Sequence, residues 1–192
     1  EQMRAEIIAL GGEVRFEQRV TGLDIVDGRV RGVQLASGET VATDHVVLAL
    51  GHSARDTFES LHAQGVFMEP KPFSVGFRIE HPQSLIDRAR LGVHAGNPLL
   101  GAADYKLVHH AANGRAVYSF CMCPGGTVVA ATSEPNRVVT NGMSQYSRNE
   151  RNANAGIVVN VDPTDYGGCM ENPVAGITFQ RDLESRAFVL GG

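Results

Sequence analysis

EVRFEQRVTGLDIVDGRVRGVQLASGETVATDHVVLALG, residues 13–51, is the stretch that decides the fold of the first part of the chain. Within it, the dipeptides Asp27-Gly28 and Ser37-Gly38 are tight-turn signals. They separate three short runs rich in β-branched residues, near 20–26, 29–35 and 39–43. The sequence therefore predicts a small antiparallel meander of three strands.

Two further strands are predicted on either side of this meander. Val14 and Phe16 alternate with charged neighbours, as in a short strand. Residues 45–50 are almost continuously apolar, as expected of a strand buried on both faces of a parallel sheet. Gly51 ends this run, and apolar residues at helical spacing predict a helix over 54–63.

The composition changes at Glu69-Pro70-Lys71-Pro72, where we expect a second, β-rich part to begin. The predicted elements are strands over 73–79, 116–123, 127–132 and 156–161, a short helix after Pro82, a polar loop over 133–155, and a loop with weak helical signals over 162–180. Pro124-Gly125-Gly126 predicts that the second and third of these strands form a hairpin. The whole chain is expected to be α+β, with an α/β feature in the strand at 45–50.

Composition and charge exclude several classes of function. The net charge of −4 over 192 residues gives no footprint for nucleic acid and no basic stripe for anionic lipid. No apolar run reaches the roughly 18–20 residues of a membrane span, and no signal peptide opens the chain. The three cysteines are an odd number, so a reducing cytoplasm is expected rather than a secreted disulfide framework.

Cys121 and Cys123 are two residues apart on a predicted strand, so both side chains are expected on the same face. Their Cα atoms would lie roughly 6.5–7 Å apart, at or beyond the usual limit for a disulfide. Together with His109-His110 they match no standard zinc spacing. We therefore expect packed, unreactive cysteines and no metal site.

The order of strand, meander and apolar strand resembles the second half of the FAD-binding domain in glutathione-reductase-like flavoproteins. There, the last strand ends in an Ala-Thr-Gly-type motif beside the flavin. Here the motif reads Ala49-Leu50-Gly51, with leucine in place of threonine. Glycine lets the backbone pass close to a dinucleotide. A plain strand-to-helix turn explains the same glycine, and the spacing alone leaves both interpretations open.

Longer stretches resemble a bacterial family of largely uncharacterised FAD-dependent dehydrogenases, which are NAD(P)/FAD-dependent oxidoreductases. These stretches are GGEVRF (11–16), GHSARDTF (51–58), MEPKPFSVGFRIEHP (68–82), CMCPGG (121–126), NGMS (141–144) and GITFQR (176–181). The resemblance runs along essentially the whole chain.

This resemblance implies an internal fragment of an enzyme more than twice this length. The Gly-x-Gly-x-x-Gly loop that binds the flavin pyrophosphate is expected before Glu1, and the segment that closes over the flavin after Gly192. The resemblance further implies a partial FAD-binding domain over 1–70, a substrate domain over 71–180, and a return toward the FAD-binding domain over 181–192. The fragment itself is expected to be inactive and to bind FAD weakly or not at all.

Four residues are carried over from the resemblance as cofactor-binding positions. Val20 would contact the adenine through its backbone N–H and C=O. Gly51, His52 and Ser53 would lie near the isoalloxazine or the ribityl chain. The alternatives are a core valine at position 20 and an N-cap of the following helix at Ser53.

Arg78, Arg137, Asn141 and Arg148 are the candidates for recognising an anionic substrate. The alternatives are a solvent-exposed strand face for Arg78 and a solvated loop for the other three. No catalytic residue is identified. The parent enzyme is expected to move a hydride between FAD and a small organic substrate, with NAD(P)H as a candidate reductant. The alternative is a non-catalytic α+β ligand-binding module with a flavoprotein-derived fold.

Overall fold

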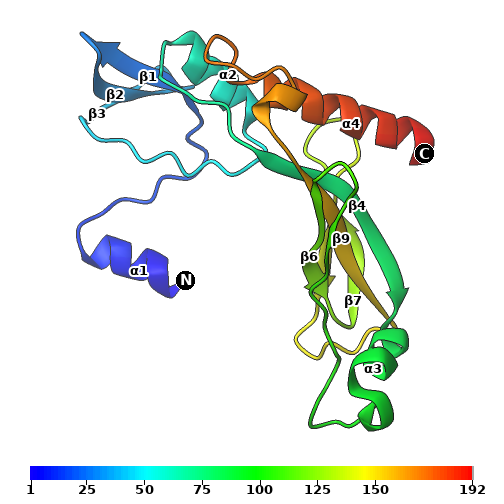
Figure 1. Cartoon of the computed structure of the whole chain (residues 1–192). Helices are drawn as coiled ribbons and strands as arrows, with labels where there is room; N and C mark the ends of the chain where they lie inside the picture. The colour runs from blue at the N-terminus through cyan, green and yellow to red at the C-terminus, as the bar shows by residue number, and fades with distance from the viewer. Residues whose placement is uncertain (192) are drawn as a thin grey trace. The chain divides into compact units, whose positions relative to one another are not determined.

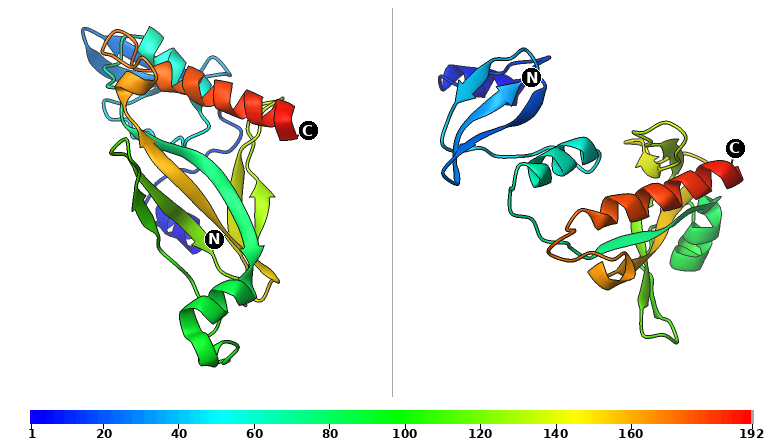
Figure 2. Two further views of the ribbon diagram at one scale, coloured as in Figure 1. Left: turned by 45° about the vertical axis from the view of Figure 1, so that its right-hand side comes forward. Right: turned by 90° about the horizontal axis from the view of Figure 1, so that it is seen from above.

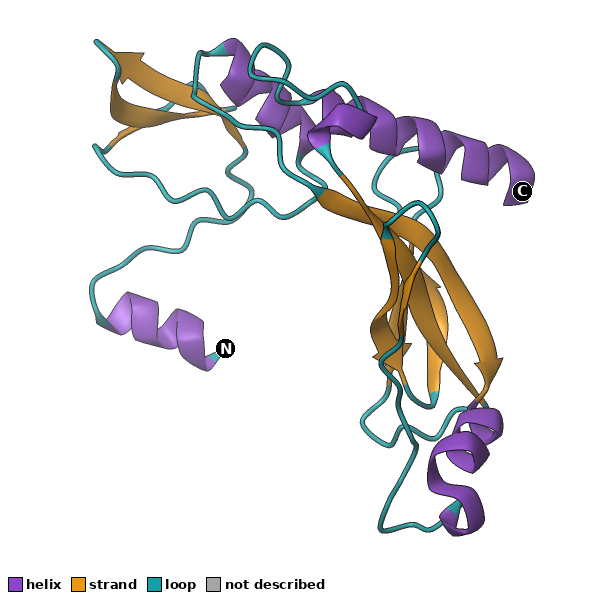
Figure 3. Ribbon diagram, viewed as in Figure 1, coloured by secondary structure: helices purple, strands orange, loops and turns teal. Residues whose placement is uncertain are grey.

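The computed structural model describes residues 1–191, which form two compact units, one over Glu1–Met68 and one that begins at Glu69. Helices and antiparallel sheets occur side by side along the chain (Figure 3), so the α+β class expected from the sequence is confirmed. Within residues 1–191, every pair of neighbouring strands in the sheets is antiparallel. Each unit is described below by itself.

The elements have the following bounds. The helices are α1 (Gln2–Ala9), α2 (Arg55–Ala63), α3 (Gln83–Leu91), η1 (Gly92–His94), η2 (Pro163–Asp165) and α4 (Ala175–Gly191). The strands are β1 (Val20–Val26), β2 (Arg29–Leu35), β3 (Thr40–Ala42), β4 (Phe73–Pro82), β5 (Val108–His110), β6 (Ala116–Cys123), β7 (Gly126–Ala130), β8 (Thr140–Ser144) and β9 (Asn152–Val161).

The first unit contains the expected meander of β1, β2 and β3, in that order. Asp27 and Gly28 both have positive φ, which is what a tight two-residue hairpin turn requires. Leu23 and Leu35 of the sheet and Leu61 of α2 are buried. Gln64, just after α2, accepts a 3.1 Å hydrogen bond from the Leu23 backbone N–H, which ties the helix to β1.

Two of the strands predicted for this unit are wrong. Residues 45–50 and the stretch around Val14 and Phe16 are loop (Figure 3). A strand forms only where a neighbour pairs with its backbone groups, and among residues 1–191 neither segment has such a neighbour. Val47 is consequently 92% exposed, although its sequence neighbours are apolar.

The second unit is built on a four-stranded antiparallel sheet in the order β4-β9-β6-β5. The two long strands β4 and β9 pair in unbroken register, from Phe73 opposite Val161 to Pro82 opposite Asn152. α4 lies across one end of this sheet and α3 follows β4 at the other end (Figures 1 and 2). The strand over 73–79 and the helix after Pro82 are thus present, and the strand is longer than expected.

The predicted hairpin around Pro124 is wrong. β6 pairs with β5 and β9, whereas β7 leaves this sheet and pairs with β8. The reason lies in an irregularity between Phe120 and Cys123, where the β6–β9 register shifts and Cys121 has a left-handed φ of +50°. The same irregularity corrects the expectation for the cysteines. Cys121 is exposed and Cys123 is buried, both as free thiols.

The expected loops over 133–155 and 162–180 also need correction. The first contains β8 and the beginning of β9, and the second contains η2 and the beginning of α4. α4 is anchored by its aromatic contact with the sheet, since the rings of Phe73 and Phe179 are 6.1 Å apart and Tyr166 lies 5.2 Å from Phe73. None of the helices within residues 1–191 is both long and apolar enough to cross a membrane.

Phe73, Val75, Phe77 and Ile79 alternate with polar residues and glycine, which predicts that their face of β4 is buried, but the middle of the strand shows the reverse pattern. Phe77 is 83% exposed, whereas Arg78 is half-buried. β8 accounts for the burial of Arg78, because Gly142 of β8 lies against its guanidinium. With β8 over this face, the guanidinium of Arg78 lies among polar groups from several strands.

Candidate functional site

Three of the stretches that carry the family resemblance meet around Arg78, and we call this place the Arg78 junction. It comprises Arg78 on β4, residues 121–126 from the end of β6 to the start of β7, residues 141–144 of β8, and Asn154 on β9. These segments are up to 76 residues apart in sequence, and hydrogen bonds join them directly. Ser144 Oγ closes the assembly by donating to the Pro124 carbonyl at 2.8 Å.

Arg78 is held only by neutral oxygen atoms. Its Nη1 donates to Asn154 Oδ1 at 2.6 Å and to the Cys121 carbonyl at 3.3 Å, and its Nη2 reaches Asn141 Oδ1 at the long distance of 3.5 Å. No carboxylate among residues 1–191 forms an ion pair with it. A half-buried guanidinium without a counter-charge is uncommon, because buried charges are normally paired.

Asn154 is the most deeply buried polar residue of the junction. Its side chain is fully buried, and its Oδ1 accepts from Arg78. Its Nδ2 is also buried and has no acceptor among the described residues. A buried amide donor without a partner costs about 1–3 kcal/mol, so its retention calls for an explanation.

Gly142 makes the close approach of β8 possible. A Cβ at this position would overlap with Asn154 Oδ1 and Arg78 Nη1, and it would lie 2.8 Å from Cys123 Sγ. Glycine is therefore required here for space and not for its backbone angles. Gly142 also donates its N–H to the side chain of Asn141 at 2.8 Å, which orients that amide.

The turn beside Arg78 has a constrained backbone. Cys121 is a non-glycine residue with positive φ, a conformation that costs about 1–3 kcal/mol and clusters at functional sites. Its carbonyl accepts both from Arg78 and from the Cys123 thiol, at 3.4 Å in the second case. Gly125, with φ of +47°, donates its N–H to the buried Gln83 Oε1 at 2.8 Å. The turn is thus fixed from both sides.

A second polar pair joins His81 of β4 to Tyr105, which lies in the loop before β5. His81 Nε2 and the Tyr105 hydroxyl are 2.8 Å apart, and His81 Nδ1 is buried without a partner among the described residues. Burial raises the pKa of Tyr105, and the positive charge of Arg78 opposes part of this rise. The positive charge of Arg78 therefore also acts on the Tyr105 hydroxyl, to which it is not hydrogen-bonded.

The structure brings only two of the four predicted substrate residues together, namely Arg78 and Asn141. Arg137 instead pairs with Glu134, which also binds Arg181 of α4 at 2.8 Å. Arg148 is exposed, and its backbone carbonyl lies against Gly125. The sequence does not predict three further parts of the site, namely Asn154, the Cys121 carbonyl and Gly142, because only the strand pairing brings them to Arg78.

The cofactor residues expected in the first unit are placed as follows. Val20 begins β1 and is half-buried. Gly51 has a φ of +73° with open space where a Cβ would stand, so its backbone conformation requires glycine. His52 and Ser53 are exposed and lie 3.3 Å apart through Nδ1 and Oγ. Ser53 is not the N-cap of α2, because that position belongs to Ala54.

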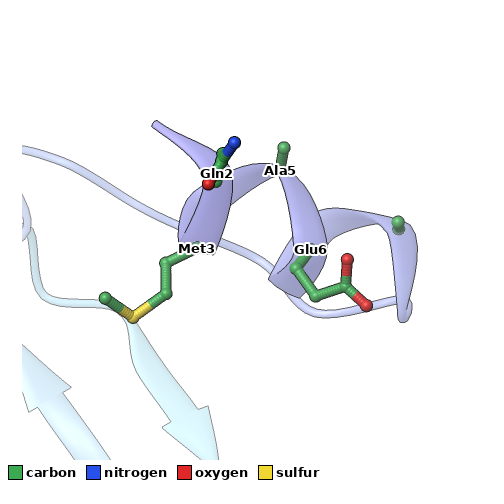
Figure 4. Close-up of a pocket in the computed structure, with 5 residues that line it drawn as sticks. Gln2, Met3, Ala5 and Glu6 are labelled. Atoms are coloured by element: carbon green, nitrogen blue, oxygen red, sulfur yellow. The ribbon is translucent and has the colours of Figure 1, made fainter.

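Of these four residues, Gly51, His52 and Ser53 are exposed and Val20 is half-buried. The segment around Gly51 is exposed and open to a ligand, but the 192 residues include no Gly-x-Gly-x-x-Gly loop for a pyrophosphate. A hollow on α1, lined by side chains of this helix alone, is open surface (Figure 4). Within residues 1–191 no group of three His, Cys, Asp or Glu side chains could hold a metal ion.

The chain is thus an α+β protein of two units with antiparallel sheets, and its second unit contains the Arg78 junction. Residues 72–192 match the family described as FAD-dependent protein, C-terminal domain-like, and the chain belongs to this family. It is also 47% identical over 191 residues to an uncharacterized protein of Clostridium beijerinckii. That match covers 99% of this chain but 35% of the relative, so the chain spans about a third of the relative's length.

Proposed function

We propose that this chain is part of an FAD-dependent oxidoreductase of the dehydrogenase type. The observation that carries the proposal is the family match over residues 72–192. FAD, when bound, would supply the hydride chemistry with an organic substrate. The chain would contribute a rim of the flavin site in its first unit and a substrate-binding surface in its second.

The loop 45–54 supports the cofactor part of this proposal. Its apolar residues Val47, Leu48 and Leu50 are exposed, although an apolar run of this kind is typical of a buried parallel strand. Further strands from a longer protein would pair with this run and cover it. The Ala49-Leu50-Gly51 segment would then end a sheet strand beside the flavin, as ligands bind at the carboxyl ends of such strands.

The Arg78 junction supports the substrate part. Three family-resembling stretches converge there, and they leave an unpaired charge and an unpaired buried amide. Structural cores rarely keep such groups without a ligand or an ordered water. The remaining parts of the same polypeptide would be the partner of this chain, and the chain alone would be inactive.

The test is the flavin content of the full-length protein. It should purify yellow, or take up FAD on reconstitution, with about one flavin per chain released on denaturation. NAD(P)H is the first reductant to try, because bleaching of the flavin absorbance under anaerobic conditions would identify it directly. A full-length protein that stays colourless and binds no FAD would overturn the proposal, and would favour a non-catalytic binding module instead.

A further inference from the structure

We infer that the Arg78 junction binds the carboxylate group of an organic acid, with Arg78 and Asn141 as its ligands and Asn154 as a positioning residue. This inference rests on the proposed function and names the substrate class of the second unit. It follows from three features of the junction, which are its charge, its free donors and its geometry.

The charge comes first. Arg78 is always protonated, and its described partners are all neutral oxygens. The nearest acid on the same strand face, Glu80, is held by Asn152 Nδ2 at 2.6 Å. An incoming anion would therefore gain an ion pair with Arg78 without having to break one.

The free donors come second. A guanidinium has five N–H groups in a planar fork, and in Arg78 two acceptors contact Nη1 and one, at a long distance, contacts Nη2. The Nε–H has no acceptor among the described residues, and Nη2 has only the long 3.5 Å contact with Asn141. These two groups form one edge of the fork, and that edge matches the two oxygens of a carboxylate.

The positioning comes third. Asn154 Oδ1 and the Cys121 carbonyl together hold Nη1, so the guanidinium cannot rotate freely and its Nε–Nη2 edge keeps one direction. Asn141 is exposed, and its Oδ1 accepts from the Gly142 N–H and contacts Arg78 Nη2, so its amide group offers a further donor close to Nη2. Preorganised donors of this kind lower the entropic cost of binding.

The experiment titrates sodium acetate into the isotopically labelled 192-residue chain, with sodium chloride keeping the ionic strength constant. Acetamide, which has the same shape without the charge, is the control probe. We expect saturable shifts of the Arg78 Nε–H and Asn141 side-chain NMR signals with acetate only. Equal shifts with acetamide or with chloride alone, or shifts that never saturate, would overturn the inference.

Variants separate binding from a structural role. Arg78→Gln should weaken acetate binding at least about tenfold, the effect of losing a charge-assisted pair. Arg78→Lys, which keeps the charge but lacks the fork, and Asn141→Ala, at an exposed position, should each weaken it less. Arg90→Gln, at an exposed arginine of α3 outside the junction, should bind as the wild type does.

The outcome remains decisive if Arg78→Gln does not fold. Wild-type acetate affinity in both Arg78→Lys and Asn141→Ala would then overturn the inference. A negative acetate titration can also be distinguished from a failure of the flavoprotein proposal. A yellow full-length protein whose chain binds no acetate refutes the carboxylate site alone, whereas a colourless full-length protein refutes the flavoprotein proposal whatever the titration shows.

Discussion

At the scale of single residues, the Arg78 junction depends on how closely β8 can approach the sheet. Gly142 sets this distance, because a Cβ there would meet Asn154, Arg78 and Cys123. The neighbouring strand offers a useful contrast at Gly156, where the nearest atom to an added Cβ is the Phe120 carbonyl oxygen at 3.3 Å. The two glycines therefore differ in how much space a methyl group would find.

Gly142→Ala is expected to destabilise the chain by about 1–3 kcal/mol, the cost of overpacking a closely packed site. Gly156→Ala should cost less, because a shift of a few tenths of an ångström accommodates it. Denaturant-induced unfolding of both variants measures the difference. Equal stability of the two variants would show that Gly142 of β8 is not packed closely against Arg78 and Asn154.

The ion pair between Arg115 and Asp165 gives a pH-dependent prediction. Asp165 accepts from both terminal nitrogens of Arg115, at 2.9 and 2.6 Å, and from the Asp162 N–H. These contacts hold the pKa of Asp165 below its usual value of 3.8, with the Arg115 bonds as the largest cause. Since the folded pKa is the lower one, the contribution to stability is present above this value and is lost as the pH falls through the folded pKa.

Wild-type protein should therefore have a higher melting temperature than Asp165→Asn at neutral pH, and the gap should close under acid conditions. Thermal unfolding at a series of pH values checks this. A gap that stays constant down to the lowest pH would contradict the account. Arg115→Gln should return the pKa of Asp165 toward its ordinary value, which NMR titration of the carboxyl group measures.

At the scale of elements, the sequence predicts those strands whose turns carry a local signal. Asp27-Gly28 specifies the β1–β2 hairpin, and the alternation of apolar residues specifies β4. β8 is missed because its sequence, TNGMS, is polar, and its position comes from pairing with β7. The β6 irregularity at Cys121 depends on contacts with Arg78 from a distant strand, so no local pattern announces it.

The residues of the site also differ in whether the sequence or only the tertiary structure reveals them. Arg78 and Asn141 could be selected from the sequence because their residue types suit an anion. Asn154 could have been found from the alternation of Asn152 and Asn154 with small residues, which is a strand pattern with a polar face. The neutral environment of the guanidinium could not be predicted, because it depends on β4, β6, β8 and β9 coming together.

The loop 131–139 is docked onto α4 by Glu134, which pairs with Arg137 and Arg181. Glu134→Gln should cost about 1.5–3 kcal/mol, because it removes charged hydrogen bonds in a partly buried place. Asp182→Asn is the matched control on α4, since its pair with Arg186 is exposed and worth about 0.3–0.5 kcal/mol. Urea unfolding distinguishes the two, and a loss at Glu134 no larger than at Asp182 would contradict the docking.

The exposed run at 45–50 is expected to behave differently in the chain and in the full-length protein. In the 192-residue chain its amides have no strand partner and should exchange rapidly with solvent deuterium. In the full-length protein they should be protected, because neighbouring strands would pair with them. Protection in the chain alone, or rapid exchange in both, would rule out the proposal that residues 45–50 form a paired strand only in the full-length protein.

At the scale of the whole molecule, the chain comprises two units and spans about a third of the length of its relative. Under the proposed function, its first unit would offer a flavin only the rim around Gly51, and the sequence has no glycine-rich pyrophosphate loop. The chain alone is therefore expected to show no saturable quenching of FAD fluorescence at micromolar concentrations. Tight binding of FAD by the 192 residues would contradict this division of roles.

One absorbance measurement tests both the proposed FAD binding and the proposed carboxylate site at the Arg78 junction. Acetate is added to the full-length protein with FAD bound, and the visible absorbance of the flavin is followed in the wild type and in Arg78→Gln. The account predicts a saturable change in the flavin spectrum for the wild type, and a change at least about tenfold weaker in apparent affinity for the variant. An identical change in both proteins, or none in a wild type that has its FAD bound, would contradict it.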